Sequence, residues 1–209
     1  MMTAASRLAA GLSDQGLSLD SHQQQQLLTF IELMAQWNTR HNLTAINDPM
    51  QMVIRHLLDS LAPVSMLDQG PVLDIGSGAG LPGIPLAIAA PNVSFTLLDS
   101  SRKRTRFMQH VKNTLRLGNV VGEHSRGERY RAEPGFTQVW TRAFSSLDAM
   151  IAGSSHLLAP QGEFVALKGK VPHDELDAVA ARVSDLRVDP LTVPGLNEER
   201  CVIRFSPAR

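Results

Sequence analysis

A short apolar run that leads directly into three glycines constrains this chain more than any other feature. Residues 72–75 read Val-Leu-Asp-Ile, and Gly76, Gly78 and Gly80 follow before a helical pattern begins near Gly83. Glycines in such a loop permit unusual backbone dihedrals and a close approach to a ligand, while the following helix offers free N–H groups and positive potential. The stretch predicts a nucleotide-like ligand, although an isolated Gly-x-Gly-x-Gly fits a purely structural turn about equally well.

From residue 71 onward, short apolar runs alternate with helical segments, which is typical of repeated βαβ units and a largely parallel sheet. We expect six or seven strands, the first five at 72–75, 93–98, 120–121, 138–141 and 164–167, with helices at 83–90, 102–117, 146–158 and 174–186. The last two strands, at 187–193 and 201–205, are joined by a segment too short for a crossover helix. These two strands should therefore be antiparallel.

The residues before this alternation look helical throughout. Apolar residues recur at helical spacing over 21–38, and a second helix is predicted from Pro49 to about Pro63. A chain of 209 residues suits one main domain with a modest extension. We therefore predict an N-terminal helical extension at 1–67 and a main domain at 68–209.

The side chains around the glycine loop narrow the identity of the ligand. Asp99 closes the second predicted strand, where a doubly wound fold uses a carboxylate to bind ribose hydroxyls. Residues 78–83 also satisfy Gly-x-Gly-x-x-Gly, which would make the chain a nicotinamide-dinucleotide oxidoreductase. Asp74 in the first strand, Pro82 and Pro85 in the helix start, and the terminal hairpin argue against that alternative. S-adenosylmethionine fits better, because a carboxylate near the loop can hold its ammonium group.

A run of positive charge lies in the helix predicted over 102–117. Its cations are Arg102, Lys103, Arg104, Arg106, Lys112 and Arg116, whereas the whole chain is neutral, with 20 basic and 20 acidic residues. A solvated helix face is the usual meaning of such a run, and RNA phosphates are the alternative partner. Aromatic residues make up only 5% of the chain, so we expect no stacking platform of the kind that binds single strands. A non-catalytic RNA-binding module would use this helix and leave the glycine loop idle.

An ordered set of short motifs resembles one family, the bacterial RsmG (glucose-inhibited division protein B) methyltransferases. The matching segments are Trp37-Asn38, 42–46, 56–60, 74–86, 98–100, 103–104, Phe107, 125–126, 142–144 and 167–169. The resemblance implies a Rossmann-like class I methyltransferase fold, with a seven-stranded, mostly parallel sheet, an antiparallel last strand and an N-terminal helical extension. It also implies methyl transfer from S-adenosylmethionine to N7 of a guanine in 16S ribosomal RNA. Guanine N7 is a lone-pair acceptor without a proton, so the reaction needs no general base.

The glycine loop and the resemblance together predict which residues serve the cofactor and the substrate. The predicted cofactor-binding residues are Asp74, Gly76, Gly78, Gly80, Leu81, Asp99, Gly127, Glu128 and Arg142. The predicted catalytic or guanine-positioning residues are Arg142, Lys168, His56 and Asn42. The predicted RNA-binding residues are Arg102, Lys103, Arg104, Arg106 and Arg200.

Several of these residues also have a purely structural interpretation. His56 lies on the apolar side of its helix, where a buried and satisfied histidine is the commoner finding. Asn42 can simply end a helix, Lys168 can pair with a surface carboxylate, and Arg200 can be an exposed hairpin residue. The resemblance favours the functional role in each case.

The remaining expectations concern location and partners. Cys201 is the only cysteine, residues 1–19 lack the apolar core of a signal peptide, and no stretch reaches the length of a membrane span. We therefore expect a cytoplasmic monomer that acts on 16S ribosomal RNA or the small ribosomal subunit and does not contact membranes. No group of His, Cys and carboxylates has metal-ligand spacing, so we predict no metal.

Overall fold

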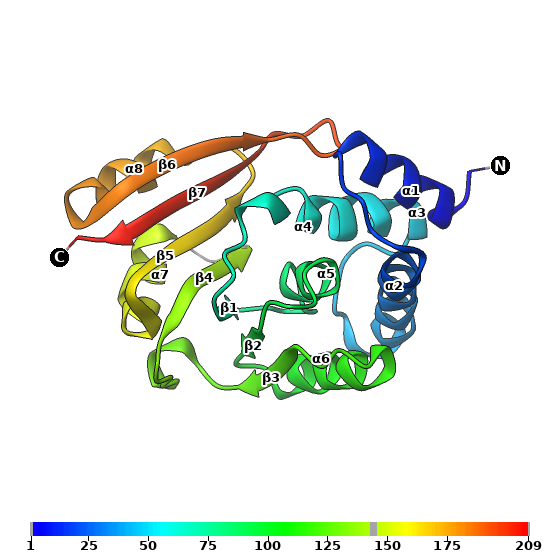
Figure 1. Ribbon diagram of the computed structural model, residues 1–209, viewed down its shortest axis with the longest axis horizontal. Helices are drawn as coiled ribbons and strands as arrows, with labels where there is room; N and C mark the ends of the chain where they lie inside the picture. Colours follow the sequence, from blue (N-terminus) through cyan, green and yellow to red (C-terminus); the bar gives the residue numbers. More distant parts are fainter. Residues whose placement is uncertain (1, 143–145, 209) are drawn as a thin grey trace.

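The computed structural model describes residues 2–142 and 146–208, which form a seven-stranded sheet with helices on both faces (Figure 1). The strands are β1 (Val72–Ile75), β2 (Phe95–Asp99), β3 (Val120–His124), β4 (Phe136–Arg142), β5 (Leu158–Lys168), β6 (Val183–Leu191) and β7 (Arg200–Pro207). Their order in the sheet is β3-β2-β1-β4-β5-β7-β6. The first five strands pair in parallel, and β7 is antiparallel to β5 and to β6. The predicted Rossmann-like sheet with an antiparallel last strand is confirmed.

The sheet separates two apolar cores, because successive side chains of a strand point to opposite faces. In β1, Val72 belongs to one core, while Leu73 and Ile75 belong to the other. All four residues of β1 are buried, as expected for a parallel strand that is covered on both faces. The first core also holds residues of α2 (Ser21–His41), α5 (Gly83–Ala89) and α6 (Arg102–Leu115), and the second holds residues of α7 (Leu147–Ser154) and α8 (His173–Val179).

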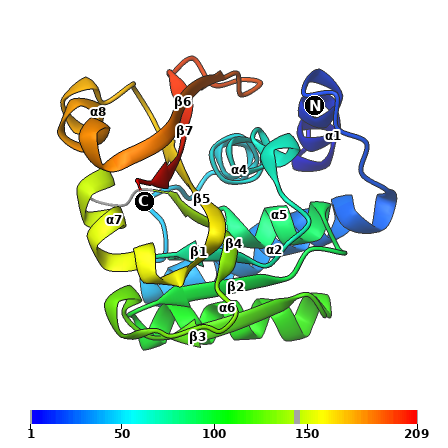
Figure 2. The same ribbon diagram turned by 60° about the vertical axis from the view of Figure 1, so that its left-hand side comes forward.

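The N-terminal helices share the first core and pack on other helices, with α2 against α5 and α6 (Figure 2). They are α1 (Ala4–Asp14), α2 and a continuous helical segment made of α3 (Pro49–Met52), the π-helical η1 (Val53–Leu58) and α4 (Asp59–Leu61). Asp20 caps α2 through the Gln23 N–H, and Asn42 ends it with a left-handed φ of 46°. Because these helices share a core with the sheet, the division at residue 67 stays a prediction about domain organisation.

Short 3₁₀ helices complete the chain, namely η2 (Val64–Met66), η3 (Gly127–Arg129), η4 (Ser155–Leu157) and η5 (Ala180–Arg182). Two helices are shorter in the structure than the sequence predicted. The helix predicted at 146–158 gives way to η4 and then to β5 at Leu158, and the helix predicted at 174–186 ends at Val179, with β6 beginning at Val183.

The apolar spacing of Leu176, Val179, Val183 and Leu186 imitates a helical period. However, β7 offers an open edge to which this segment pairs, with a register shift between Ser184 and Arg187. This segment therefore forms a strand rather than a helix, because it hydrogen-bonds to a neighbouring strand that the local sequence pattern cannot reveal.

Candidate active site

The loop after β1 adopts a conformation that glycine takes easily and other residues rarely. Gly76, Gly78 and Gly80 have φ values of 71°, 59° and 84°. The Gly76 N–H donates to the Leu98 carbonyl of β2 at 2.8 Å, and the Gly78 N–H donates to the Asp99 carboxylate at 2.9 Å. The loop is therefore fixed to the end of β2 at the carboxyl edge of the sheet, where doubly wound folds bind their ligands.

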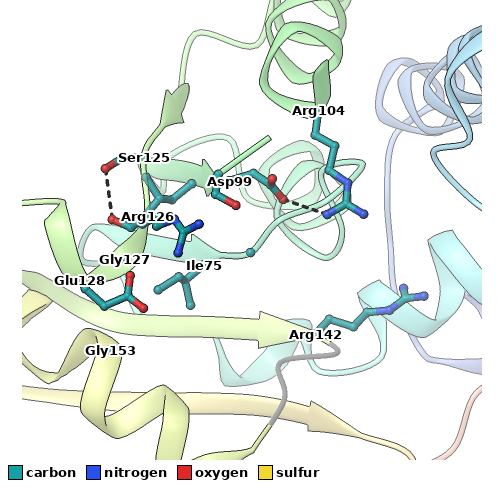
Figure 3. Close-up of a pocket in the computed structure, with 12 residues that line it drawn as sticks. Ile75, Asp99, Arg104, Ser125, Arg126, Gly127, Glu128, Arg142 and Gly153 are labelled. Atoms are coloured by element: carbon teal, nitrogen blue, oxygen red, sulfur yellow. Dashed lines mark hydrogen bonds and ion pairs between the residues drawn. The ribbon is translucent and has the colours of Figure 1, made fainter. Parts of the chain in front are cut away.

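A cavity of about 450 Å³, called here the loop cavity, opens beside the glycine loop (Figure 3). Five of the residues predicted to bind the cofactor line it, namely Gly76, Asp99, Gly127, Glu128 and Arg142. They come from the loop after β1, the end of β2, η3 and the end of β4. The other four, Asp74, Gly78, Gly80 and Leu81, belong to β1 and its loop and are not part of the lining.

The Asp99 side chain of the loop cavity is fixed by two backbone hydrogen bonds and one arginine. Its carboxylate is 4% exposed and accepts hydrogen bonds from the Gly78 N–H and from the Ser101 N–H at 2.7 Å. Arg104 lies 3.5 Å from the same carboxylate. Two carboxylate oxygens have about four acceptor positions, so Asp99 keeps capacity for hydroxyl donors of a ligand. Arg104, which was predicted to bind RNA, is thus part of the loop cavity.

Ser125 and Arg126 are among the residues of the loop cavity that were not predicted. Ser125 and Arg126 follow β3 and line the cavity, and Figure 3 shows the Arg126 side chain reaching into it. The resemblance had included both residues as a motif without a role. Their position after the third parallel strand was the signal, because that edge of the sheet collects ligand-binding residues.

Asp74 lies in β1 and is 1% exposed. Its Oδ2 accepts a hydrogen bond from the Gly83 N–H at 2.9 Å, whereas its Oδ1 has no partner in the part of the chain that the structure describes. Burial raises the pKa of Asp74 to about 7, against the lowering effects of the hydrogen bonds from Gly83 and Ser77. A cation near this oxygen would restore the ionised form. The loop cavity with Asp99 and Asp74 beside it suits an adenosine that carries a cationic amino acid.

A second cavity of about 290 Å³, called here the basic cavity, adjoins the first at Arg142. Arg142, Lys168, Arg200 and Asp59 line it, together with Leu167, Gly169, Leu191 and Cys201. Three cations and one carboxylate give this lining a positive balance. Two predicted positioning residues and one predicted RNA-binding residue therefore lie around one small cavity.

Arg142 is held by the helical segment that precedes the sheet. Its guanidinium donates to the Arg55 carbonyl at 3.0 Å and to the Ser60 hydroxyl at 3.3 Å, and it lies 3.6 Å from the Asp59 carboxylate. Figure 3 shows its side chain leaving the end of β4 and pointing away from Glu128. Burial lowers the pKa of Arg142, and the charge of Asp59 opposes that shift. The motif at 142–144 continues into residues 143–145, which lie outside the described residues.

Asp59 is the charged residue of the basic cavity that was not predicted as a site residue. Its carboxylate accepts a hydrogen bond from Arg200 Nε at 3.0 Å and faces Arg142 with its other oxygen. The Asp59 side chain is 7% exposed, so this carboxylate pairs two arginines from separate strands almost out of water. An acidic residue among the apolar residues of the 49–61 helical segment was the available signal. Arg200 is mostly buried by this contact and is not an exposed hairpin residue.

The other predicted catalytic residues lie at different depths. His56 is 4% exposed, and its Nε2 is 2.9 Å from the Thr44 hydroxyl. Burial, followed by the charge of Arg142, lowers the pKa of His56 to about 4. Asn42 is exposed and lines neither cavity. Lys168 lines the basic cavity while its ammonium pairs with Glu175 at 2.9 Å.

The predicted RNA-binding residues of α6 are exposed near its beginning. Arg102 and Arg106 have no ion pair among the described residues, and the Lys103 ammonium donates to the His41 carbonyl at the end of α2. Arg102, Lys103 and Arg106 therefore keep charge at the surface, while Arg104 is directed to Asp99. Over residues 2–142 and 146–208, no helix is both long and apolar enough to cross a membrane, and no cluster of three or more His, Cys, Asp or Glu could hold a metal.

The sheet order, the glycine loop and the carboxylate at the end of β2 define a class I S-adenosylmethionine-dependent methyltransferase. The fold is shared by a solved methyltransferase from Aquifex aeolicus, with a TM-score of 0.60, 14% identity and coverage of 78% of this chain and 96% of that one. A tRNA (m1A58) methyltransferase from the same organism has a TM-score of 0.58 at 13% identity and covers 73% of this chain and 69% of its own.

The chain belongs to the rRNA small subunit methyltransferase G family, whose model matches residues 23–203. A relative of that name from Escherichia fergusonii is 42% identical over 203 residues, which cover 97% of this chain and 98% of the relative. Another, from Erwinia tasmaniensis, is 43% identical over 197 residues, or 94% of this chain and 96% of the relative. The expected family is confirmed, and the oxidoreductase alternative is rejected.

Proposed function

We propose that this chain transfers a methyl group from S-adenosylmethionine to N7 of a guanine in 16S ribosomal RNA. The observation that carries the proposal is the position of Arg142, which lines both the loop cavity and the basic cavity. Methyl transfer requires a donor and an acceptor to be held close and in line. Two cavities that meet at one side chain suit that requirement, and the family name indicates small-subunit ribosomal RNA as the target.

In this proposal the loop cavity binds the cofactor, which supplies an electrophilic methyl group. Asp99 accepts hydrogen bonds from the ribose hydroxyls, and Gly127 with Glu128 lies by the adenine. Asp74, whose Oδ1 has no partner among the described residues, attracts the ammonium group. Gly76, Gly78, Gly80 and Leu81 shape the loop so that the backbone approaches the cofactor closely.

The basic cavity binds the acceptor guanine and its phosphate. Arg142, Lys168 and Arg200 supply positive charge around it, and Asp59 keeps the two guanidiniums in place. No residue has to remove a proton, because guanine N7 has none. This agrees with a buried His56 whose pKa is about 4, since such a side chain is neutral and serves packing and the Thr44 contact. Asn42, at the exposed end of α2, belongs to the RNA side of the site.

Labelled methyl transfer to small ribosomal subunits and to naked 16S RNA, followed by mapping of the modified base, tests the function. We expect label on N7 of one guanine, and we expect Arg142→Ala to reduce the rate at saturating RNA by at least about tenfold. Arg182→Ala is the matched control, because Arg182 is an exposed arginine whose ion pair with Asp148 lies at the surface. Transfer to a different atom, or none to either substrate, would contradict the proposal.

Cofactor identity is tested separately by calorimetry. S-adenosylmethionine should bind far more tightly than NADH, and the opposite order would indicate a dinucleotide enzyme. A ribosomal substrate supports our proposal that the protein acts in the cytoplasm. The proposed monomer can be checked by sedimentation.

A further inference from the structure

A cluster of aromatic rings lies between α2 and α6, away from both cavities. The Trp37 indole is half-buried, and its ring centroid is 5.4 Å from that of the buried Phe107. The His41 and His110 rings flank the indole with centroid distances of 5.2 Å and 5.5 Å. His110 is exposed and His41 is partly exposed. The cluster therefore combines an exposed imidazole and a partly exposed one with a half-buried indole, over the buried Phe107.

Positive charge surrounds this ring cluster. Arg40 is exposed in the last turn of α2, and Lys103 and Arg106 are exposed in α6, which contains no acidic residue. Neither Arg40 nor Arg106 has an ion pair in the described ranges of the chain. Lys103 joins the two helices through the His41 carbonyl. Figures 1 and 2 show α2 and α6 side by side, so these cations border the rings.

The ring cluster is connected to the loop cavity by the first turns of α6. Arg104, the next residue after Lys103, lines the loop cavity and faces Asp99. Because Arg142 and Arg104 both line the loop cavity, an RNA strand that leaves the basic cavity at Arg142 could pass Arg104 and reach the rings. Packing of α2 on α6 is supplied by buried apolar side chains of both helices, including the Phe30–Phe107 and Trp37–Phe107 contacts. It does not explain two imidazoles on the solvent side.

We propose that Trp37, His41 and His110, with the cations Arg40, Lys103 and Arg106, form a docking surface for single-stranded RNA next to the target guanine. An unpaired base stacks on the rings, and the flanking phosphates contact the cations. Aromatic faces bind bases with little regard to sequence, and clustered Lys and Arg bind phosphates. This inference rests on the proposed function and adds a surface to it, contrary to our expectation that the chain has no stacking platform.

The first test is His110→Ala, measured by fluorescence anisotropy with a short single-stranded oligoribonucleotide that carries a guanine. Loss of one stacking partner should weaken binding roughly tenfold. Arg116→Gln is a control, because Arg116 is exposed and follows the last residue of α6, at the end opposite Lys103, and this variant should bind within about twofold of the unaltered protein. Equal affinity of His110→Ala and the unaltered chain would overturn the proposal.

The second test uses the intrinsic fluorescence of Trp37. The chain has two tryptophans, and the other, Trp140, is fully buried, so the Trp140→Phe variant isolates the signal of Trp37. Saturating single-stranded RNA should change the Trp37 emission, whereas the same strand in a duplex should not. If the folded variant showed no change with single-stranded RNA, the proposed surface would be wrong.

The outcomes also separate this inference from the proposed function. Methyl transfer by the unaltered chain without any Trp37 response would leave the function standing and reject the surface. A Trp37 response with no methyl transfer to any ribosomal substrate would support the surface and reject the function.

Discussion

Replacement of Asp59 by Asn should damage both stability and methyl transfer, because it removes the carboxylate between Arg142 and Arg200. Removing one partner of a buried ion pair costs about 3–5 kcal/mol. Here Arg142 and Arg200 are 23% and 19% exposed and keep hydrogen bonds to other groups. We therefore expect a cost somewhat below that range, about 2–3 kcal/mol of unfolding free energy. For a chain of this size that corresponds to a fall of about 5–10 °C in Tm.

The assay combines thermal unfolding with methyl-transfer kinetics below the Tm of the variant. Cofactor affinity should stay within about threefold, because Asp59 does not line the loop cavity. The kcat/KM for RNA should fall more than tenfold, since two guanidiniums of the basic cavity lose their common anchor. Asp148→Asn is the matched control, because its ion pair with Arg182 is about half exposed, and it should change stability by less than about 0.5 kcal/mol. Equal stability of the two variants, or an unchanged kcat/KM, would refute the reasoning.

Four further predictions concern Asp74, the cofactor and RNA. Because the pKa of Asp74 is raised to about 7, the contribution of Asp74 to the free energy of unfolding should be fully present below about pH 4 and be lost as the pH rises toward 7. Thermal scans of Asp74→Asn should therefore show a Tm that changes less with pH. Affinity for the cationic cofactor should rise between about pH 6 and 8 as Asp74 ionises, and calorimetry should show no such rise in Asp74→Asn. Gly76→Asp should abolish cofactor binding in calorimetry while the chain stays folded, since it places a side chain at a φ of 71° in the cavity lining. Replacing Arg102 and Arg106 with Gln should flatten the salt dependence of RNA binding by about 0.7–0.9 log units per lost contact and leave cofactor affinity unchanged.

The parts of the molecule that local patterns encode could be predicted from the sequence. One contiguous stretch contains the strand 72–75, the glycine loop and the helix after it. Its apolar period and glycine spacing directly predict the backbone conformation. Five of the nine predicted cofactor residues line one cavity for the same reason, because the ends of parallel strands meet at one edge. The contact between Asp59 and Arg200 joins residues 141 positions apart, and no local pattern reports such a pair.

An irregular turn in the helical segment before the sheet explains why the sequence pattern did not identify Asp59 as a site residue. A regular helical period places Met52, His56 and Ser60 on the buried face and leaves Asp59 beside it. In the structure the Asp59 N–H donates to the Ile54 carbonyl, five residues earlier, because η1 is π-helical. The wider turn changes which side chains face the sheet, and such turns often occur at functional sites. Asp59 thereby reaches Arg142 and Arg200. The N-terminal region lines the basic cavity through Asp59, and it reaches the loop cavity only through its hold on Arg142, so the irregular turn positions the one side chain that the two cavities share.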